Sequence, residues 1–133
     1  MSHKKNRILI EKHILDIGTF YFYENFIVGE IVEGVNLNFE SGKELFKLAQ
    51  ANYKNDKPFV YISNRINSYS FIPTGHYKSV ALFPNLKGYA TVVYNDINYR
   101  IAELEQSFMN WPNGIFENLE DAIDWAEDIL SSH

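Results

Sequence analysis

Residues 59–70, with the sequence FVYISNRINSYS, place the tightest limit on the fold of this chain. Strand-forming residues follow Pro58 directly, and the stretch then turns polar at Asn64 and Arg65. An inner strand of an α/β sheet ends in this way and opens a crevice at its carboxyl end. The pattern therefore predicts a buried central strand with a candidate binding site where it ends.

Length and composition narrow the class of protein. A chain of 133 residues is long enough to bury one core. The absence of Cys excludes disulfides and thiolate chemistry and is typical of a reducing compartment. No apolar run is long enough to cross a bilayer. We expect a flexible N-terminus over residues 1–7, a single domain over residues 8–133, a cytoplasmic location without membrane insertion, and no cofactor.

Charge is distributed unevenly along the chain. All 12 Lys and Arg lie in residues 1–100 with 9 acids, whereas residues 101–133 contain 8 acids and no base. Phosphate contacts need clustered Lys and Arg, which argues against a nucleic-acid partner. The acidic block is either a solvated helix face or a docking face for a basic partner.

Before the central strand, local patterns predict strands and one helix. Residues 8–17 form a first strand, and residues 19–23 and 26–32 form an aromatic hairpin. Alternation sends Phe20 and Phe22 to one face of the hairpin and the tyrosines between them to the other. A helix follows from Ser41, because Ser41 and Glu44 have the spacing of a capping box.

After the central strand, helices and strands alternate. Thr74 begins a short helix that ends near Phe83, and residues 88–94 form the next strand. Asn95 or Asp96 caps a helix, for which Ile101, Leu104, Glu105 and Phe108 have the expected spacing. Residues 115–116 form a short last strand, and Asn118 caps a final amphipathic helix.

The two inner strands predict two different sheet faces. One face is aliphatic and suits helix packing, with Val60, Ile62, Ala90 and Val92. The other face is mixed and rich in Tyr, with Phe59, Tyr61, Ser63, Tyr89, Thr91 and Val93. We therefore expect most helices on the aliphatic face and a homodimer formed through the Tyr-rich face.

This order of elements, with a polar loop after residues 59–64, resembles the STAS domain of anti-sigma-factor antagonists, the SpoIIAA-like fold, over residues 8–130. The resemblance implies an α/β domain with a mixed sheet of four to five strands and about four helices mainly on one face. It also implies a non-enzymatic binding module, like many stand-alone bacterial STAS-like proteins.

The phosphorylation signature of that family is incomplete here. The family carries Asp-Ser-x-Gly in the loop, and its Ser is phosphorylated by a partner kinase. In this chain Gly75 matches the glycine, but Pro73 stands in place of the Ser and Ile72 in place of the Asp. The hydroxyls nearby that could be phosphorylated instead are Ser68, Ser70 and Thr74.

Two polar clusters at predicted strand ends form the candidate site. If the strands before Asn64 and Asn95 are parallel neighbours, Arg65 and Arg100 face one crevice and can hold an anion or a carboxylate-bearing partner. In the alternative, Asn95 and Asp96 only cap a helix and the arginines are solvated. The candidate partner- or ligand-binding residues are Asn64, Arg65, Asn67, Ser68, Tyr69, Ser70, Thr74, Asn95 and Arg100. On this hypothesis Arg65→Ala and Arg100→Ala leave folding nearly intact.

No pattern predicts catalytic or metal-binding residues. The four His lie far apart in the sequence, and no Ser lies in a glycine-flanked nucleophile elbow. We therefore expect a non-catalytic cytoplasmic module that binds a regulatory protein through residues 65–74 and the helix that follows. The alternatives are a small-molecule or lipid carrier with a pocket beneath that loop and, less favoured, an enzyme that uses the Asn64, Arg65 and Arg100 crevice.

Overall fold

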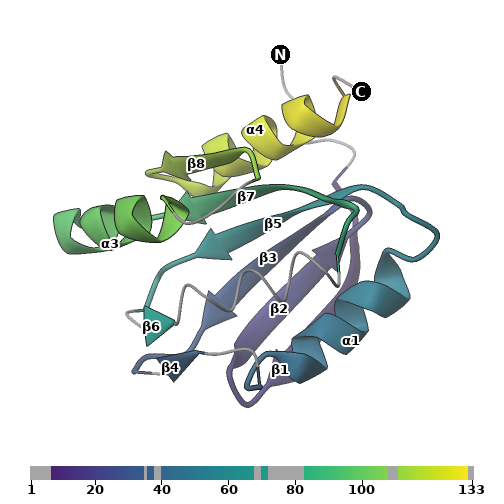
Figure 1. Ribbon diagram of the computed structural model, residues 1–133, viewed down its shortest axis with the longest axis horizontal. Coiled ribbons are helices and arrows are strands. Elements are labelled where there is room, and N and C mark those ends of the chain that lie inside the picture. The colour runs from purple at the N-terminus through teal and green to yellow at the C-terminus, as the bar shows by residue number, and fades with distance from the viewer. Residues whose placement is uncertain are drawn as a thin grey trace.

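The structure is a computed structural model that describes residues 7–34, 36–37, 40–67, 70–71, 83–107 and 111–131. A twisted six-stranded sheet runs through it in the order β1-β2-β3-β5-β7-β8 (Figure 1). Its strands are β1 (Leu9–Leu15), β2 (Gly18–Tyr23), β3 (Phe26–Ile31), β5 (Phe59–Asn64), β7 (Leu86–Val92) and β8 (Asn113–Phe116). A separate parallel pair consists of β4 (Asn36–Leu37) and β6 (Ser70–Phe71).

The main sheet is mixed, as predicted. Strands β1, β2 and β3 form an antiparallel meander, and β3, β5, β7 and β8 run parallel to one another. The predicted count of four to five strands is too low, because β1 and the short β8 both join the sheet as edges. The predicted aromatic hairpin is confirmed as β2 and β3, which pair directly.

Three helices are described, and they cover both faces of the sheet. They are α1 (Lys43–Asn52), α3 (Asp96–Gln106) and α4 (Leu119–Ser131). α4 packs on the predicted aliphatic face, against residues that include Val60 and Ile62. α1 and α3 lie on the opposite face, where Phe59 joins the α1 core and Thr91 contacts Gln106 of α3. The prediction that most helices pack on the aliphatic face is therefore wrong, since two of the three described helices lie on the other face. Most of the helix predicted from Thr74 lies outside the described residues.

The Tyr-rich face is buried inside the chain. Tyr61 is half-buried against the α1 core and Tyr89 is buried, with their ring centroids 5.4 Å apart. The Tyr-rich face is thus not available as the homodimer surface that the sequence predicted. Tyrosines in alternate strand positions suggested an amphipathic outer face, but their rings contact each other beneath the helices.

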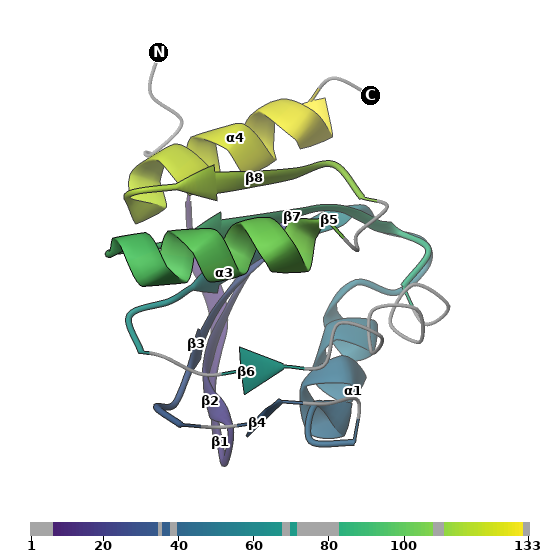
Figure 2. The ribbon, with the colours of Figure 1, turned by 60° about the vertical axis from the view of Figure 1, so that its left-hand side comes forward.

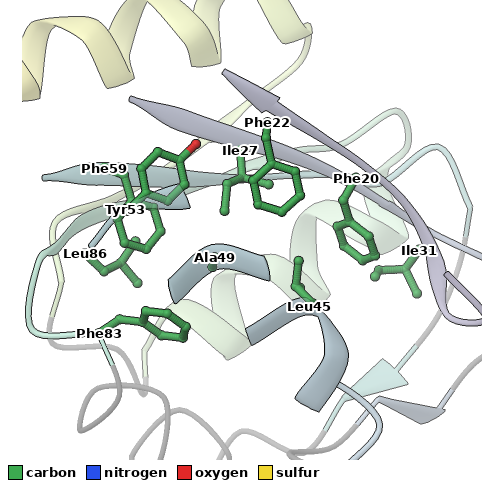
Figure 3. Packing of buried hydrophobic residues seen from close by; sticks show 10 residues of the cluster. All are labelled: Phe20, Phe22, Ile27, Ile31, Leu45, Ala49, Tyr53, Phe59, Phe83 and Leu86. Carbon is green, nitrogen blue, oxygen red and sulfur yellow. The ribbon is translucent and has the colours of Figure 1, made fainter. Parts of the chain in front are cut away.

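An aromatic core holds α1 against the sheet. The ring of Tyr53 stacks on that of Phe59 with centroids 4.4 Å apart, and Leu45 and Ala49 of α1 face the same cluster (Figure 3). The buried members of this cluster are Phe20, Phe22, Ile27, Ile31, Leu45, Ala49, Tyr53, Phe59, Phe83 and Leu86. The predicted alternation is confirmed, since Tyr21 and Tyr23 pack instead with the α4 core.

Of the three described helices, α3 and α4 have the N-cap residue that the sequence predicts. The Asn95 side chain accepts a hydrogen bond from the Asn98 N–H at 2.8 Å, as predicted for α3. The Asn118 side chain accepts one from the Asp121 N–H at 2.8 Å, as predicted for α4. The N-cap of α1 is Gly42, one residue after the predicted Ser41.

Arg7, the last residue of the predicted flexible N-terminus, is bound by α4, whereas residues 1–6 lie outside the described residues. Its guanidinium lies 2.6 Å from Glu120, 2.5 Å from Asp124 and 2.9 Å from Glu127. These acids follow one another at helical spacing along α4. Hydrogen bonds to Glu127 and to the other two acids raise the pKa of Arg7 further above its ordinary value, against the opposing effect of burial. Part of the acidic block is therefore neutralised within the chain.

The buried hydroxyl of Tyr53 ties α1 to the β2–β3 hairpin and provides a test of this packing. It lies 2.7 Å from the Tyr23 carbonyl and 3.0 Å from the Phe26 carbonyl. Burial, with the charge of Glu11, raises the pKa of this hydroxyl, so it remains a donor.

We predict that Tyr53→Phe lowers the free energy of unfolding by about 1 to 3 kcal/mol, because buried carbonyls lose their donor. Urea denaturation measures this effect. Tyr99→Phe, at an exposed position on α3, is the matched control and stays within about 0.5 kcal/mol of the unmodified protein. Equal effects of the two changes would contradict the assigned role of Tyr53.

Candidate functional site

The carboxyl ends of β5 and β7 lie side by side, as the sequence predicted. Asn64 pairs with Val92 across the two strands, and the Arg65 N–H donates to the Val92 carbonyl at 2.9 Å. Successive side chains of an extended chain point to opposite faces of a sheet. Asn64 therefore points to the face of α4, and Arg65 points to the face of α3.

On the α4 face, Asn64 links β5 to β3 and to the segment that follows β7. Its amide donates to Glu30 Oε2 at 3.0 Å, and the Tyr94 hydroxyl donates to Asn64 Oδ1 at 2.6 Å. Burial and the charge of Glu30 raise the pKa of Tyr94, although its bond to Asn64 acts in the opposite direction. The phenol thus stays protonated as a donor, and both ends of the Asn64 amide are engaged within the chain.

On the α3 face, Arg65 forms a buried ion pair with Glu105. The guanidinium donates to Glu105 Oε1, and the two residues are 1% and 5% exposed. Burial raises the pKa of the Glu105 carboxyl above its usual range, and the charge of Arg65 only partly offsets this. The prediction that the Arg65 side chain faces an open crevice is wrong, and so is the alternative that it is solvated.

Further polar contacts fix the inward side of α3. The Gln106 amide lies 3.2 Å from Thr91 Oγ1 and donates to the Gly114 carbonyl at 2.8 Å. Asn98, Glu105 and Gln106 are all buried, together with only one apolar residue of the helix, Ala102. α3 therefore meets the sheet mainly through polar side chains.

The outward side of α3 carries three large apolar residues beside the exposed Asp96, Tyr99, Arg100 and Glu103. Ile97 is 72% exposed and Leu104 is 63% exposed, and Ile101 lies exposed between them. We call Ile97, Ile101 and Leu104 the α3 stripe. In Figure 2, α3 lies in front of β7 with nothing of the described chain over its outer side. The predicted spacing of Ile101, Leu104, Glu105 and Phe108 gave the correct helix; Glu105 is buried, Ile101 and Leu104 are exposed, and Phe108 lies outside the described residues.

The remaining predicted site residues are dispersed. Asn95 caps α3, Arg100 is exposed on that helix, and the Asn67 amide donates to the Ile31 carbonyl at 3.1 Å. The structure therefore does not bring Arg65 and Arg100 together in one crevice. Ser70 begins β6, whereas Ser68, Tyr69 and Thr74 lie outside the described residues. Phosphorylation of these hydroxyls stays a prediction.

Sequence reasoning missed four residues of this region, namely Glu30, Tyr94, Glu105 and Gln106. One signal was present: Glu105 occupied a position in the predicted apolar stripe of its helix. A carboxylate at a core position requires a buried cation, and Arg65 is that partner. The bonds of Glu30 and Tyr94 to Asn64 depend on strand order, which no local pattern contains.

The described residues lack two other kinds of site. Within them, no group of three or more His, Asp or Glu side chains is arranged to hold a metal ion. No helix in the same part of the chain combines the length and apolar character needed to span a membrane.

The buried ion pair predicts a large difference between the two arginines. Arg65→Ala should lower the free energy of unfolding by about 3 to 5 kcal/mol, because it leaves the buried Glu105 carboxylate without its counter-ion. Arg100→Ala, at an exposed position, is the control and should change it by less than about 0.5 kcal/mol. Urea denaturation of both variants measures the difference. Equal free energies of unfolding for the two variants would contradict the structural role of Arg65.

The raised pKa of Glu105 predicts the sign of a pH effect. The folded state keeps this proton at pH values where the unfolded chain, with an ordinary Glu pKa of about 4.3, has lost it. Glu105 therefore contributes most to the free energy of unfolding at pH values below the ordinary Glu pKa. Its contribution falls as the pH rises through the pKa of Glu105 in the folded state.

Urea denaturation of the unmodified protein and of Glu105→Gln, at a series of pH values upward from about 4, tests the sign of this pH effect. The stability difference in favour of the unmodified protein should shrink as pH rises. Glu103→Gln, at an exposed neighbouring position, should show no such trend. A difference that grows with pH would mean that Arg65 lowers the pKa of Glu105 more than burial raises it.

Comparison with known proteins bears on the fold. No family model matches the sequence, and no curated protein matches it. An uncharacterized protein of the DUF3478 family from Shewanella loihica PV-4, with a SpoIIAA-like fold, matches with a TM-score of 0.55 at 13% identity. The match covers 95% of this chain and 98% of that protein. The chain therefore has a SpoIIAA-like fold, as its order of elements predicted.

Proposed function

We propose that this protein is a non-catalytic module that binds a regulatory protein partner through the α3 stripe. The observation that carries the proposal is the orientation of α3, which directs Ile97, Ile101 and Leu104 to the outside while Glu105 and Gln106 lie buried. A helix ordinarily turns its apolar residues toward the core. In α3, three of the four buried residues are polar, and the three largest aliphatic residues are exposed.

The exposed stripe carries a cost that a partner would remove. Burial of one Leu or Ile side chain is worth about 1.5 to 3 kcal/mol. Contiguous exposed apolar residues on a folded protein mark interaction sites more often than chance. The α3 stripe has the spacing by which an amphipathic helix docks in the groove of another protein. Arg100 lies exposed on the same helix and can contact an acidic residue of the partner.

The polar residues near the strand ends support binding rather than catalysis. Arg65 neutralises Glu105 in the interior, Asn64 bridges Glu30 and Tyr94, and Asn95 caps α3. Each of these side chains already holds the fold together, whereas a catalytic base or acid has to reach substrate. The regulatory part of the proposal is supported by the fold alone, through its likeness to anti-sigma-factor antagonists.

Site-specific photo-crosslinking in cells of the source organism tests the proposal. A photoreactive amino acid at position 104 of the full chain should give an adduct with a different protein, identified by mass spectrometry. The change Ile97→Lys, two stripe positions away, should abolish that adduct. Ile14→Lys, at a 76% exposed position on β1, is the matched control and should leave it unchanged.

Two results would contradict the proposal. The first is an adduct at position 104 that survives Ile97→Lys, because it would not depend on the stripe. The second is an equal yield of the same adduct from a photoreactive residue at position 14, because that would indicate non-specific capture.

A further inference from the structure

We infer that the contact between Arg7 and α4 is a latch that controls the first half of β1. While Arg7 is bound, this half of the strand stays on the sheet, and when Arg7 is released it opens without unfolding of the domain. We call this contact the Arg7 latch. The inference goes beyond the proposed function and does not depend on the role of the α3 stripe.

Arg7 is held by α4 through every nitrogen of its guanidinium. Nε and Nη2 donate to the two carboxylate oxygens of Glu127 at 3.1 and 2.9 Å, the two-pronged geometry that makes an Arg–carboxylate pair specific. Nη1 donates to Glu120 at 2.6 Å, and Nη2 also donates to Asp124 at 2.5 Å. The Arg7 side chain is only 9% exposed. The contact is therefore more specific than an ordinary surface ion pair.

The acids that hold Arg7 repel one another without it. Glu120, Asp124 and Glu127 follow at intervals of four and three residues, so their carboxylates lie on one face of α4. Like charges at these intervals destabilise a helix. Residues 101–133 contain no Lys or Arg, so a cation that offsets this repulsion comes from another part of the chain, and Arg7 supplies one.

The first half of β1 is weakly attached to the sheet. β1 is one edge of the sheet, so it has a neighbouring strand on one side only (Figure 1). Ile8, Leu9 and Ile10 are exposed, so they bury little apolar surface. The register of β1 on β2 shifts between Leu9 and Glu11, so Ile10 is an extra residue that interrupts the ladder. The contact of Arg7, just before the strand, therefore decides whether this half stays in place.

The second half of β1 is anchored independently of the latch. The His13 ring meets the Phe22 ring edge-on with centroids 5.6 Å apart, and Leu15 packs against the α1 core. Glu11 accepts a hydrogen bond from the Asn52 amide of α1 at 3.2 Å. These contacts attach the strand to β2 and α1 beyond the extra residue. Opening at the latch therefore stops there and does not spread through the sheet.

The closed and open forms differ in surface chemistry. In the closed form Arg7 covers the acids of α4, and Leu9 pairs with Tyr23 of β2. In the open form those carboxylates lose this cation, and the backbone of β2 at Tyr23 loses its neighbour. Glu120 and Asp124 are each 40% exposed, so dissolved ions reach them and compete with Arg7. Ionic strength therefore shifts the balance toward the open form.

Hydrogen exchange of the full chain, followed by NMR residue by residue, tests the latch. In Arg7→Gln the protected amides of residues 9–11 should exchange more than about tenfold faster, because this half of the strand opens locally. The amides of residues 13–15 and of β5 should change by less than about threefold. Lys43→Gln, which removes an exposed lysine paired with Glu40, is the matched control and should leave exchange in β1 unchanged.

Changes on the α4 side and in salt test the same contact. Glu127→Gln should also speed exchange at residues 9–11, because Glu127 accepts both prongs of the guanidinium. Combining it with Arg7→Gln should add little to either single change, because either one already breaks the pair. An increase in NaCl from about 0.05 M to about 1 M should speed this exchange more in the unmodified protein than in Arg7→Gln.

Three results would overturn the inference. Unchanged exchange at residues 9–11 in Arg7→Gln would show that the strand stays on the sheet without the contact. Equal acceleration in β1 and β5 would show that the whole domain opens and that Arg7 only contributes to overall stability. Full additivity of Arg7→Gln and Glu127→Gln would show that the two residues act separately.

Discussion

The buried ion pair between Arg65 and Glu105 determines how α3 lies on the sheet. Arg65 follows β5 directly, so its guanidinium is fixed beneath the helix by a strand at the centre of the sheet. A buried cation requires a counter-charge, and Glu105 supplies it. With Glu105 and Gln106 facing the sheet, Ile97 and Leu104 of the same helix stay exposed. The ion pair therefore fixes the buried side of α3 against the sheet.

Much of the fold could be predicted from the sequence because its signals are local. The hairpin follows from the alternation of Phe20 and Phe22 with tyrosines, and the starts of α3 and α4 follow from the capping residues Asn95 and Asn118. These features depend on residues within a few positions of one another. The aliphatic face was also predicted, since Val60 and Ile62 pack beneath α4.

The candidate site was harder to predict because it depends on distant pairs. Arg65 and Glu105 are 40 residues apart, and Arg7 is more than 100 residues from the acids of α4 that bind it. Periodicity indicates that a helix is amphipathic, but the sheet beneath it decides which side is buried. Apolar residues ordinarily win that competition. Here the buried side of α3 instead carries Glu105, whose counter-ion is the Arg65 guanidinium that follows β5.

The free energies involved explain why this reversal leaves the protein ready to bind. If α3 turned on its axis to bury the stripe, each apolar side chain would gain about 1.5 to 3 kcal/mol. The same turn would separate Glu105 from Arg65, at about 3 to 5 kcal/mol, and break the Gln106 hydrogen bonds at about 1 kcal/mol each. These terms are of similar size, so the isolated chain cannot satisfy both sides of α3. A second helix laid over the stripe satisfies both, because it covers the apolar side chains and leaves the ion pair intact.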